Sequence, residues 1–468
     1  MSDHAALDAA HGHARAFLDT LRDRPAGPSA TTAEVAGALG GPLPVTGSDP
    51  VAVIDRLARA AEPGLANSPG PRYFGWVMGG SVKSATAADT LAVAWDQVAG
   101  MQVMSPAAAA AEEVAGAWLV ELLGLPEGVS FGFATGAQMA NFTGLAAARH
   151  AVLKRAGWDV ERGGLQGAPS VRVFAGEQSH ATVYLALRYL GLGAPRQIPV
   201  DVEGRIRPEA LAEALGGGEG PAIVCAQAGD VNSGAFDPFG EIADLCATYG
   251  AWLHVDGAFG LWAAASPALR HLVEDVDRAD SWATDCHKWL NVPYDSAVVF
   301  VRDPEAHAAA MTWQTSYVTP GEGREPYRYA PEASRRARGF AVWAAIAEMG
   351  AEGIADLVDR CCANARRFAG LVAAESGVEI LNDVVLNQVV VRFGDSDAVT
   401  HDVAARVQAE GTCWLGGTTW NGRDALRFST TNWSTTAEDI DRSAAAVLAA
   451  YRASLATGPR PAATSPAG

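Results

Sequence analysis

The stretch Ser281-Trp-Ala-Thr-Asp-Cys-His-Lys-Trp-Leu-Asn-Val-Pro-Tyr-Asp295 joins two strand-like runs, and Lys288 lies at its centre. Lysine is rare in this chain, because nearly all of its 35 Lys and Arg residues are arginine. Arginine supplies charge but no usable primary amine, whereas a primary amine forms a Schiff base with a carbonyl compound. The alternative is an ordinary lysine whose ammonium group reaches solvent. The neighbouring Asp285, His287 and apolar residues favour a reactive amine.

Short apolar runs alternate with helical segments on both sides of this stretch. Such alternation predicts an α/β fold with a mainly parallel sheet covered by helices on both faces. The expected strands are Ser130–Ala134, Val171–Ala175, Ala222–Gln227, Trp252–Asp256, Ser281–Asp285 and Ala297–Val301. The expected helices between them include Ala137–Leu153, Ala181–Leu190, Pro208–Leu215 and Pro238–Tyr249.

Chemically capable residues follow several of these strands. Thr135-Gly-Ala137, His180, Asp256 and Lys288 each lie at or just beyond a strand's carboxyl end. Ligands of parallel α/β sheets bind at that edge, so the shared position is a stronger argument than any one residue. The Thr135 turn leaves a strand and opens a helix, which is suited to an anion, although strand–glycine–helix turns are common.

Two of these residues also have structural interpretations. A buried Asp256 needs a partner, which a protonated pyridine nitrogen or local N–H groups would supply. His180 could stack on a planar ring or transfer protons, but a single histidine is more often structural. Together the residues offer an anion cradle, a flat stacking group, a carboxylate and an amine.

Composition narrows the class of protein. The net charge of −18 argues against nucleic acid and anionic membranes as partners. The 6 cysteines show no CxxC pair and no metal-ligand spacing, so we expect reduced thiols, no metal and a cytoplasmic location. We expect no signal peptide or membrane span. The expected segments are a helical arm (1–105), a large domain (106–335), a small α/β domain (336–455) and a disordered tail (456–468).

The motifs Asp256-Gly-Ala258 and Asp285-Cys-His-Lys288-Trp289, with the Thr135 turn and His180, resemble those of a known enzyme family. They are similar to the group II decarboxylases of amino acids that depend on pyridoxal 5′-phosphate (PLP), the relatives of aromatic-L-amino-acid and glutamate decarboxylases. The resemblance covers most of the chain. It implies the aspartate aminotransferase-like fold (type I), with a seven-stranded, mainly parallel sheet, and a homodimer with shared active sites.

The resemblance also implies a role for each residue. Lys288 would form the Schiff base with PLP, Asp256 would pair with the ring nitrogen, and His287 would relay protons. The other expected cofactor contacts are His180 and Ala258 on the two faces of the ring, and Gly136, Ala137 and Asp285 at the phosphate. The implied reaction removes the α-carboxylate of an L-amino acid and releases the amine.

Substrate-binding residues are carried over with more alternatives. Tyr317, in a loop with the composition of a mobile active-site segment, matches the tyrosine that protonates the substrate carbon; the alternative is an exposed aromatic. Arg427 matches an arginine near the substrate carboxylate. Phe74 and Trp76 favour an aromatic or apolar substrate, although packing explains them equally well. Transamination, oxidative deamination to an aldehyde, C–C lyase chemistry and a non-catalytic homologue remain open.

Overall fold

The computed structural model describes residues 3–313 and 323–459. Contacts divide the chain into two compact units. Unit 1 comprises Met1–Met78, Arg367–Leu381 and Val390–Gly468, and unit 2 comprises Gly79–Arg366 and Asn382–Val389. The four segments expected from the sequence remain a prediction of domain organisation.

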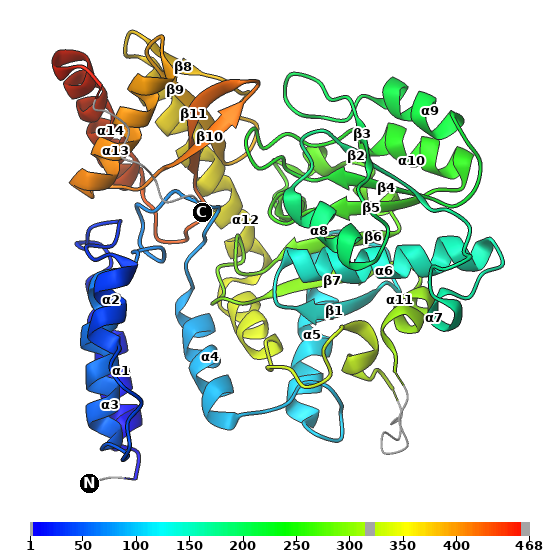
Figure 1. Ribbon diagram of the computed structural model, residues 1–468, viewed down its shortest axis with the longest axis horizontal. Coiled ribbons are helices and arrows are strands. Elements are labelled where there is room, and N and C mark those ends of the chain that lie inside the picture. The colour runs from blue at the N-terminus through cyan, green and yellow to red at the C-terminus, as the bar shows by residue number, and fades with distance from the viewer. Residues whose placement is uncertain (1–2, 314–322, 460–468) are drawn as a thin grey trace. The chain divides into compact units, whose positions relative to one another are not determined.

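A seven-stranded sheet forms the centre of unit 2 (Figure 1). Its strand order is β1-β7-β6-β5-β4-β2-β3. Neighbouring strands from β6 to β3 are parallel, and β7 is antiparallel to both β1 and β6. The expected α/β class and mainly parallel sheet are therefore confirmed. The strands are β1 Ser130–Ala134, β2 Arg172–Gly176, β3 Arg196–Ile198, β4 Ala222–Gln227, β5 Trp252–Asp256, β6 Ser281–Asp285 and β7 Ala297–Val301.

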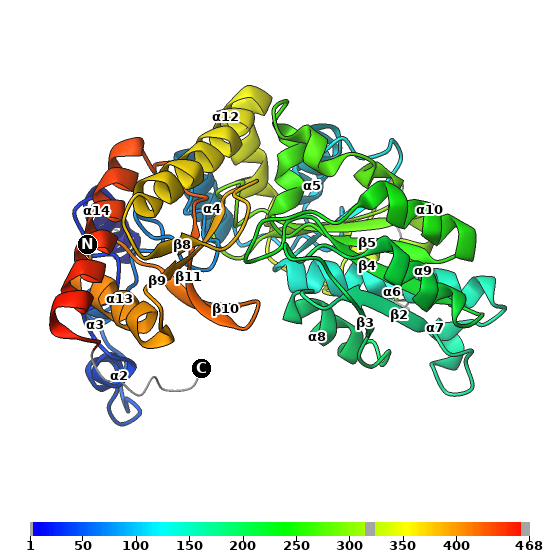
Figure 2. The same cartoon turned by 90° about the horizontal axis from the view of Figure 1, so that it is seen from above.

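The central strands are buried along their whole length because helices cover both faces. Every residue of β4, β5, β6 and β7 is buried, which explains why their sequences are continuous apolar runs rather than alternating ones. Helices α6 and α8 lie on one face of the sheet, and α9 and α10 on the other (Figure 2). The larger helices of unit 2 are α4 Lys83–Trp95, α5 Pro106–Leu122, α6 Ala137–Arg155, α8 Ala181–Tyr189, α9 Pro208–Gly216, α10 Phe239–Tyr249 and α11 Pro304–Met311.

Smaller elements complete unit 2, and one long helix belongs to both units. The short helices are α7 Val160–Gly163, η2 Gly260–Ala265, η3 Arg270–Val273, η4 Val276–Arg278 and η5 Pro326–Tyr329. Helix α12 spans Gly339–Ala373 and has a non-helical residue, Gly350, inside it. The φ of Gly350, 62°, lies in the left-handed region, which glycine adopts without a steric penalty. This glycine accounts for the kink.

A four-stranded sheet of order β10-β11-β9-β8 belongs to unit 1, apart from the first two residues of β9, and unit 1 has helices at both ends of its sequence. The first three helices bury none of their residues, consistent with an arm that has no core of its own. The strands are β8 Val378–Ile380, β9 Gln388–Phe393, β10 Gly416–Trp420 and β11 Arg423–Ser429. The helices are α1 Ala5–Asp19, α2 Thr32–Leu39, α3 Pro50–Ala61, η1 Glu62–Gly64, α13 Asp397–Glu410 and α14 Ala437–Thr457.

Helix α14 is sharply defined at its start and reaches into the expected tail. Thr436 and Asp439 form a capping box, in which each side chain accepts the backbone N–H of the other residue. The helix continues to Thr457, so the first two residues of the tail expected at 456–468 are helical. Residues 460–468 of that tail lie outside the described residues.

All six cysteines are buried and carry free thiols. Within the described residues, no helix combines the length and the apolar character needed to cross a bilayer.

Candidate active site

Three neighbouring strands bring the predicted carboxylates to one edge of the sheet. In the ladder between β4 and β5, Gln227 pairs with Asp256, the last residue of β5. Asp256 pairs in turn with Ala283 of β6, two residues before Asp285 at the end of that strand. Because these strands are parallel, their carboxyl ends meet at the same edge. The structure therefore brings Asp256 and Asp285 together as the sequence predicts.

Lys288 lies in the turn after β6 and is held by Asp285. Its Nζ is 3.0 Å from Asp285 Oδ2. The other oxygen of this buried carboxylate, Oδ1, accepts the backbone N–H of Ala137 at 2.6 Å. Ala137 is the first residue of α6, so the carboxylate also occupies the positive end of a helix dipole. Asp285 thus connects the amine to the helix N-terminus.

His287 is neutral and carries its proton on Nε2. The backbone N–H of Ser296 donates to His287 Nδ1 at 3.1 Å, which makes Nδ1 an acceptor. Nε2 lies 3.3 Å from Asp285 Oδ1, and burial lowers the pKa of His287, which opposes a second proton. The ring of Tyr294 stacks on this imidazole with centroids 4.2 Å apart. The Asp285 carboxylate therefore bridges an amine and an imidazole N–H.

Asp256 is buried and hydrogen-bonded on both oxygens. Its Oδ1 accepts the backbone N–H of Ala258 at 3.1 Å, and its Oδ2 accepts Nδ2 of Asn141 at 3.0 Å. Asn141 follows Ala137 by four residues on α6, and residues at this spacing lie on one helix face. One face of α6 therefore contacts both carboxylates of the sheet edge, Asp285 through Ala137 and Asp256 through Asn141.

A chain of buried polar groups continues behind Asn141. Asn141 Oδ1 lies 3.0 Å from His254 Nε2, and His254 Nδ1 lies 2.8 Å from Ser281 Oγ. Trp252 Nε1 donates to the same hydroxyl at 2.9 Å. Sequence reasoning missed this chain. The available signal was that Trp252 and His254 alternate with Asp256 along β5, so the three share one strand face.

His180 lies beyond β2, at the start of α8. Its backbone N–H donates to Gln227 Oε1 at 3.2 Å, and Gln227 pairs with Asp256 in the sheet. Its Nδ1 lies 2.8 Å from Thr182 Oγ1 and accepts the Thr182 N–H. The imidazole is exposed. The backbone is thus anchored beside the carboxylate edge, while one ring nitrogen caps the helix.

Gly79 packs directly on the backbone of the lysine turn. A Cβ built on Gly79 would lie 1.8 Å from the carbonyl oxygen of Lys288. The adjoining Val82 N–H donates to the carbonyl of Asn291 at 2.8 Å. Only glycine permits this approach, so the segment that begins unit 2 clamps the turn that presents the amine.

The predicted substrate residues that the structure describes belong to unit 1. Phe74 is 1% exposed, and its ring lies 4.2 Å from that of Phe428. It is a core residue, and its buried ring offers a substrate no surface in the described chain. Trp76 is 59% exposed and its ring lies 5.9 Å from that of Trp414, while Arg427 is a partly buried residue of β11. Tyr317 lies outside the described residues.

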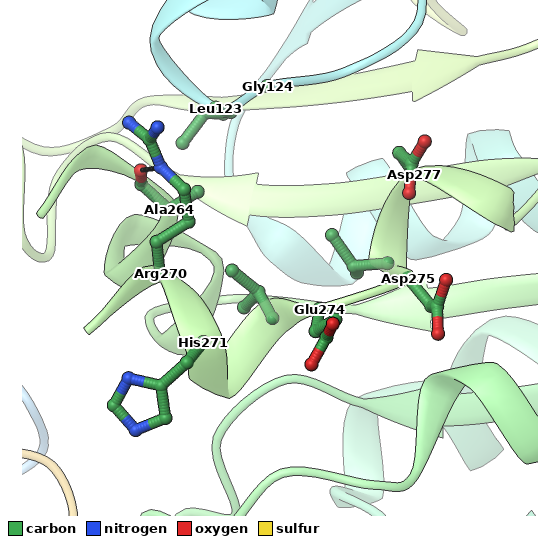
Figure 3. Close-up of a pocket in the computed structure, with 10 residues that line it drawn as sticks. Leu123, Gly124, Ala264, Arg270, His271, Glu274, Asp275 and Asp277 are labelled. Atoms are coloured by element: carbon green, nitrogen blue, oxygen red, sulfur yellow. Dashed lines mark hydrogen bonds between the residues drawn. The ribbon is translucent and has the colours of Figure 1, made fainter. Parts of the chain in front are cut away.

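A separate cavity of about 460 Å³ in unit 2 contains none of the predicted site residues. It lies beside η2 and η3, where Arg270 donates to the carbonyl of Ala264 (Figure 3). Charges of both signs line it, with Glu274, Asp275 and Asp277 among them. Nothing in this lining resembles the arrangement at the strand ends.

The residues at the strand ends fit PLP. The N-terminus of α6 supplies backbone N–H groups suited to a phosphate, Lys288 supplies the amine, and Asp256 supplies a fixed, buried carboxylate suited to a protonated ring nitrogen. Among the described residues, no group of three or more His, Cys, Asp or Glu side chains is placed to hold a metal ion.

Comparisons with known proteins agree with this reading. The family model for the pyridoxal-dependent decarboxylase conserved domain matches residues 44–394. Tryptophan decarboxylase 1 of Oryza sativa is 29% identical over 425 residues, covering 82% of this chain and 81% of the relative. Aromatic-L-amino-acid decarboxylase of Bacillus atrophaeus is 27% identical over 417 residues, covering 85% of each chain.

Solved structures show the same fold. The crystal structure of Oryza sativa TDC with PLP and tryptamine matches with a TM-score of 0.90 and 24% identity, covering 97% of this chain and 98% of that chain. A relative whose name denotes a different activity, 4-hydroxyphenylacetaldehyde synthase of Rhodiola rosea, is 25% identical over 423 residues, covering 86% of this chain and 85% of the relative. Since the family model matches well over half of the chain, the protein belongs to the family of pyridoxal-dependent decarboxylases and is a PLP-dependent amino-acid carboxy-lyase.

Proposed function

We propose that this enzyme decarboxylates an L-amino acid with an aromatic or otherwise apolar side chain and releases the corresponding amine. The observation that carries the site assignment is the meeting of Lys288, Asp285, Asp256 and the α6 N-terminus at one sheet edge. When bound, PLP supplies an electron sink that accepts the electron pair left by the departing carboxylate. The protein's residues bind, orient and move protons around that centre.

The proposed contacts follow from the positions of the groups. Lys288 is the residue that links covalently to the cofactor. Asp256 pairs with the ring nitrogen, which a carboxylate keeps protonated. His180 and Ala258 flank the ring. The backbone N–H of His180 donates to Gln227, and the backbone N–H of Ala258 donates to Asp256.

The phosphate is proposed to bind near Gly136 and Ala137. Asp285 already accepts the Ala137 N–H and carries negative charge, so it repels a phosphate placed directly against it. We therefore propose that Asp285 contributes here mainly by fixing the lysine and the first turn of α6. Its amide partner places the helix N-terminus, and its other oxygen holds the amine at 3.0 Å.

Proton movement at Lys288 is proposed to use the same carboxylate. A lysine nitrogen must lose protons before it can attack a carbonyl carbon. Asp285 Oδ2 is within hydrogen-bonding reach of that nitrogen, and its Oδ1 faces His287 Nε2. The neutral imidazole, whose Nδ1 accepts the Ser296 N–H, donates its Nε2–H to the other carboxylate oxygen and so orients Asp285. His287 thus acts behind Asp285 in this proposal.

The preference for an apolar substrate is supported from two sides. Two of the relatives named above are a tryptophan decarboxylase and an aromatic-L-amino-acid decarboxylase. In unit 1, the exposed Trp76 belongs to an aromatic group in which the Tyr73 and Trp414 rings stack with centroids 5.0 Å apart. We propose Trp76 as a contact for the substrate side chain and Arg427 as the partner of its carboxylate.

We propose a homodimer whose active sites are shared between the two chains. Unit 2 exposes aromatic residues that a second copy would cover: the Trp118 and Trp343 rings stack with centroids 6.1 Å apart, and their residues are 36% and 43% exposed. Val114 lies one turn before Trp118 on α5 and is 40% exposed. An exposed apolar cluster of this kind marks a protein interface.

The free buried thiols support a cytoplasmic location, where thiols stay reduced.

Borohydride trapping tests the lysine assignment. The chain contains only Lys83, Lys154 and Lys288, so peptide mass spectrometry identifies the labelled amine without ambiguity. We expect the pyridoxyl mass on Lys288 alone, and none in Lys288→Arg. Label on either of the other lysines would contradict the site. Incubation with a panel of amino acids, with products identified by mass, then separates amine and CO₂ from aldehyde or keto acid.

Light scattering tests the dimer. We expect Trp118→Glu to shift the protein towards the monomer, because a buried charge costs several kcal/mol. Tyr189 on α8, which is 56% exposed, provides the matched control: Tyr189→Glu should leave the dimer intact. An active wild-type monomer would refute the proposal.

A further inference from the structure

The polar chain behind Asp256 has one hydrogen-bond direction. An asparagine amide has one donor end and one acceptor end. Asn141 Nδ2 faces Asp256 Oδ2 at 3.0 Å, because the reverse orientation would set an amide oxygen against a carboxylate. Asn141 Oδ1 is therefore the acceptor for His254 Nε2 at 3.0 Å. This contact requires the hydrogen of His254 to be on Nε2.

The other end of this hydrogen-bonded series, at Ser281, determines the role of His254 Nδ1. Burial lowers the pKa of His254 to about 3, so the imidazole is neutral and Nδ1 is an acceptor. Ser281 therefore donates its O–H to Nδ1 at 2.8 Å and accepts the indole N–H of Trp252 at 2.9 Å. The donors run in one direction, from Trp252 through Ser281, His254 and Asn141 to Asp256.

No side chain in this hydrogen-bonded series can reverse its donor and acceptor roles. His254, Asn141 and Ser281 are all 0% exposed, so water cannot replace a lost partner. A Cβ on Gly144 would lie 2.9 Å from the His254 ring, which shows how closely α6 confines the imidazole. Buried hydrogen bonds linked in series polarise one another. The chain thus gives Asp256 one fixed position and one permanent donor.

We propose that His254 is a positioning residue that acts through Asn141 to orient the Asp256 carboxylate and hold it as the acceptor of the cofactor's ring N–H. This inference rests on the proposed pairing of Asp256 with the ring nitrogen. His254 touches neither cofactor nor substrate. Its contribution is to keep the Asn141 amide from rotating, so that one carboxylate oxygen is always occupied and the carboxylate plane is fixed.

Two substitutions separate the ends of the imidazole. The terminal amide of glutamine reaches the position of Nε2, so His254→Gln keeps a donor for Asn141. The shorter asparagine reaches only the position of Nδ1, so His254→Asn keeps the contact with Ser281 and loses the donor. We expect His254→Gln to behave much like the wild type and His254→Asn to be impaired.

A second buried histidine provides the control for general damage. His307 is also 0% exposed, its Nδ1 lies 2.9 Å from Ser130 Oγ, and burial lowers its pKa to about 3. Its partner Ser130 does not belong to the series of hydrogen bonds that ends at Asp256. His307→Asn therefore imposes a comparable loss of packing and hydrogen bonding without changing the proposed orientation of the carboxylate.

The readout is the ratio of two dissociation constants, for PLP and for its 1-deaza analogue, in which a C–H replaces the ring nitrogen. Quenching of the fluorescence of the 13 tryptophans reports both. A hydrogen bond to a charged group justifies a preference for PLP of roughly tenfold or more. We expect His254→Asn and Asn141→Leu to remove most of this preference, and His254→Gln and His307→Asn to retain it.

The outcomes are distinguishable. If His254→Asn weakens both ligands equally and keeps the wild-type ratio, His254 is structural and the inference is overturned. If Asp256→Ala also keeps the ratio, the pairing of Asp256 with the ring nitrogen fails, and the proposed function fails with it at that contact. The ¹⁵N chemical shift of ring-labelled PLP provides a second readout: it should move towards the unprotonated value in His254→Asn only if the inference holds.

Discussion

Acid should destabilise this protein through two histidines that are buried in the neutral form. Burial lowers the pKa of His254 and of His307 from 6.5 to about 3. Below pH 6.5 the unfolded chain protonates both residues while the folded chain protonates neither. Because the unfolded state then binds more protons, stability falls as the pH falls.

Asp237 opposes the fall of stability in acid, because the folded state binds one proton on this carboxyl group that the unfolded state does not. Burial raises its pKa from 3.8 to about 7, against the two backbone N–H groups of Ile206 and Gln227 that hydrogen-bond the carboxylate. The folded chain therefore carries this proton between about pH 4 and 7, and the unfolded chain does not. The stability that this group contributes at low pH is lost as the pH rises through that window.

The sum of the three groups is a net uptake of about one proton on unfolding near pH 5. One proton corresponds to about 1.4 kcal/mol of unfolding free energy per pH unit. Urea unfolding at pH 6.5, 5.5 and 4.5, followed by tryptophan fluorescence, measures this slope. His307→Gln should remove most of it, and Asp237→Asn should make it steeper, whatever each does to stability at pH 7. An unchanged slope in His307→Gln would refute the reasoning.

Three further predictions follow from single contacts or positions. Gly79→Ala places a Cβ 1.8 Å from the Lys288 carbonyl oxygen. We therefore expect the free energy of unfolding to fall by about 2 kcal/mol or more and PLP to be retained less well on gel filtration. Gly417→Ala is the control, because a Cβ there has no other atom within 4 Å. Glu112→Gln leaves the buried Arg335, 2.5 Å away, without its counter-ion and should cost about 3–5 kcal/mol in urea unfolding, whereas Glu112→Leu with Arg335→Met should recover most of that loss. Tyr317→Phe, at the position implied to protonate the substrate carbon, should retain CO₂ release and, with dissolved O₂ as the two-electron oxidant and water as the source of the carbonyl oxygen, shift the product from amine to aldehyde, ammonia and hydrogen peroxide. The same amine at the same rate in the presence of O₂ would show that another group is the acid.

The sheet could be predicted because its strands are apolar along their whole length. Five of the six expected strands have the predicted bounds, and the sixth, β2, differs by one residue at each end. Strand β3 was missed because Arg196 and Gln197, two of its three residues, are exposed and polar. Strand β10 begins at Gly416, in a segment whose glycines and threonines give no apolar run.

The helices likewise include some that the sequence predicted and some that it did not. Helix α10 was expected to begin at Pro238 and begins one residue later. Helices α4 and α11 were missed although both are regular. The N-cap residue of α4 has no side-chain hydrogen bond, so the usual sequence signal for a helix start is absent there. Aromatic residues were equally ambiguous, because composition does not distinguish the buried Phe74 from the exposed Trp76.

At the candidate site, local sequence predicted the residues but not the contacts between them. The strand-end rule selected His180, Asp256 and Lys288 from their positions, whereas the role expected of Asp285 came from the family resemblance. The contact between Asn141 and His254 joins residues 113 apart in sequence, and the contact between Ala137 and Asp285 joins residues 148 apart. Such pairings depend on how α6 lies across the strand ends, which no local pattern specifies.

These long-range contacts give two carboxylates at one sheet edge different hydrogen-bond partners. Asp285 faces the Lys288 amine and the His287 Nε2–H, so it can exchange a proton with the amine while the imidazole N–H orients it. Asp256 instead accepts two neutral N–H groups, from Asn141 and Ala258. Neutral donors orient a carboxylate without cancelling its charge, so Asp256 keeps its attraction for a protonated ring nitrogen. One helix therefore contacts both the carboxylate that we propose for proton transfer at the amine and the carboxylate that we propose for pairing with the ring nitrogen.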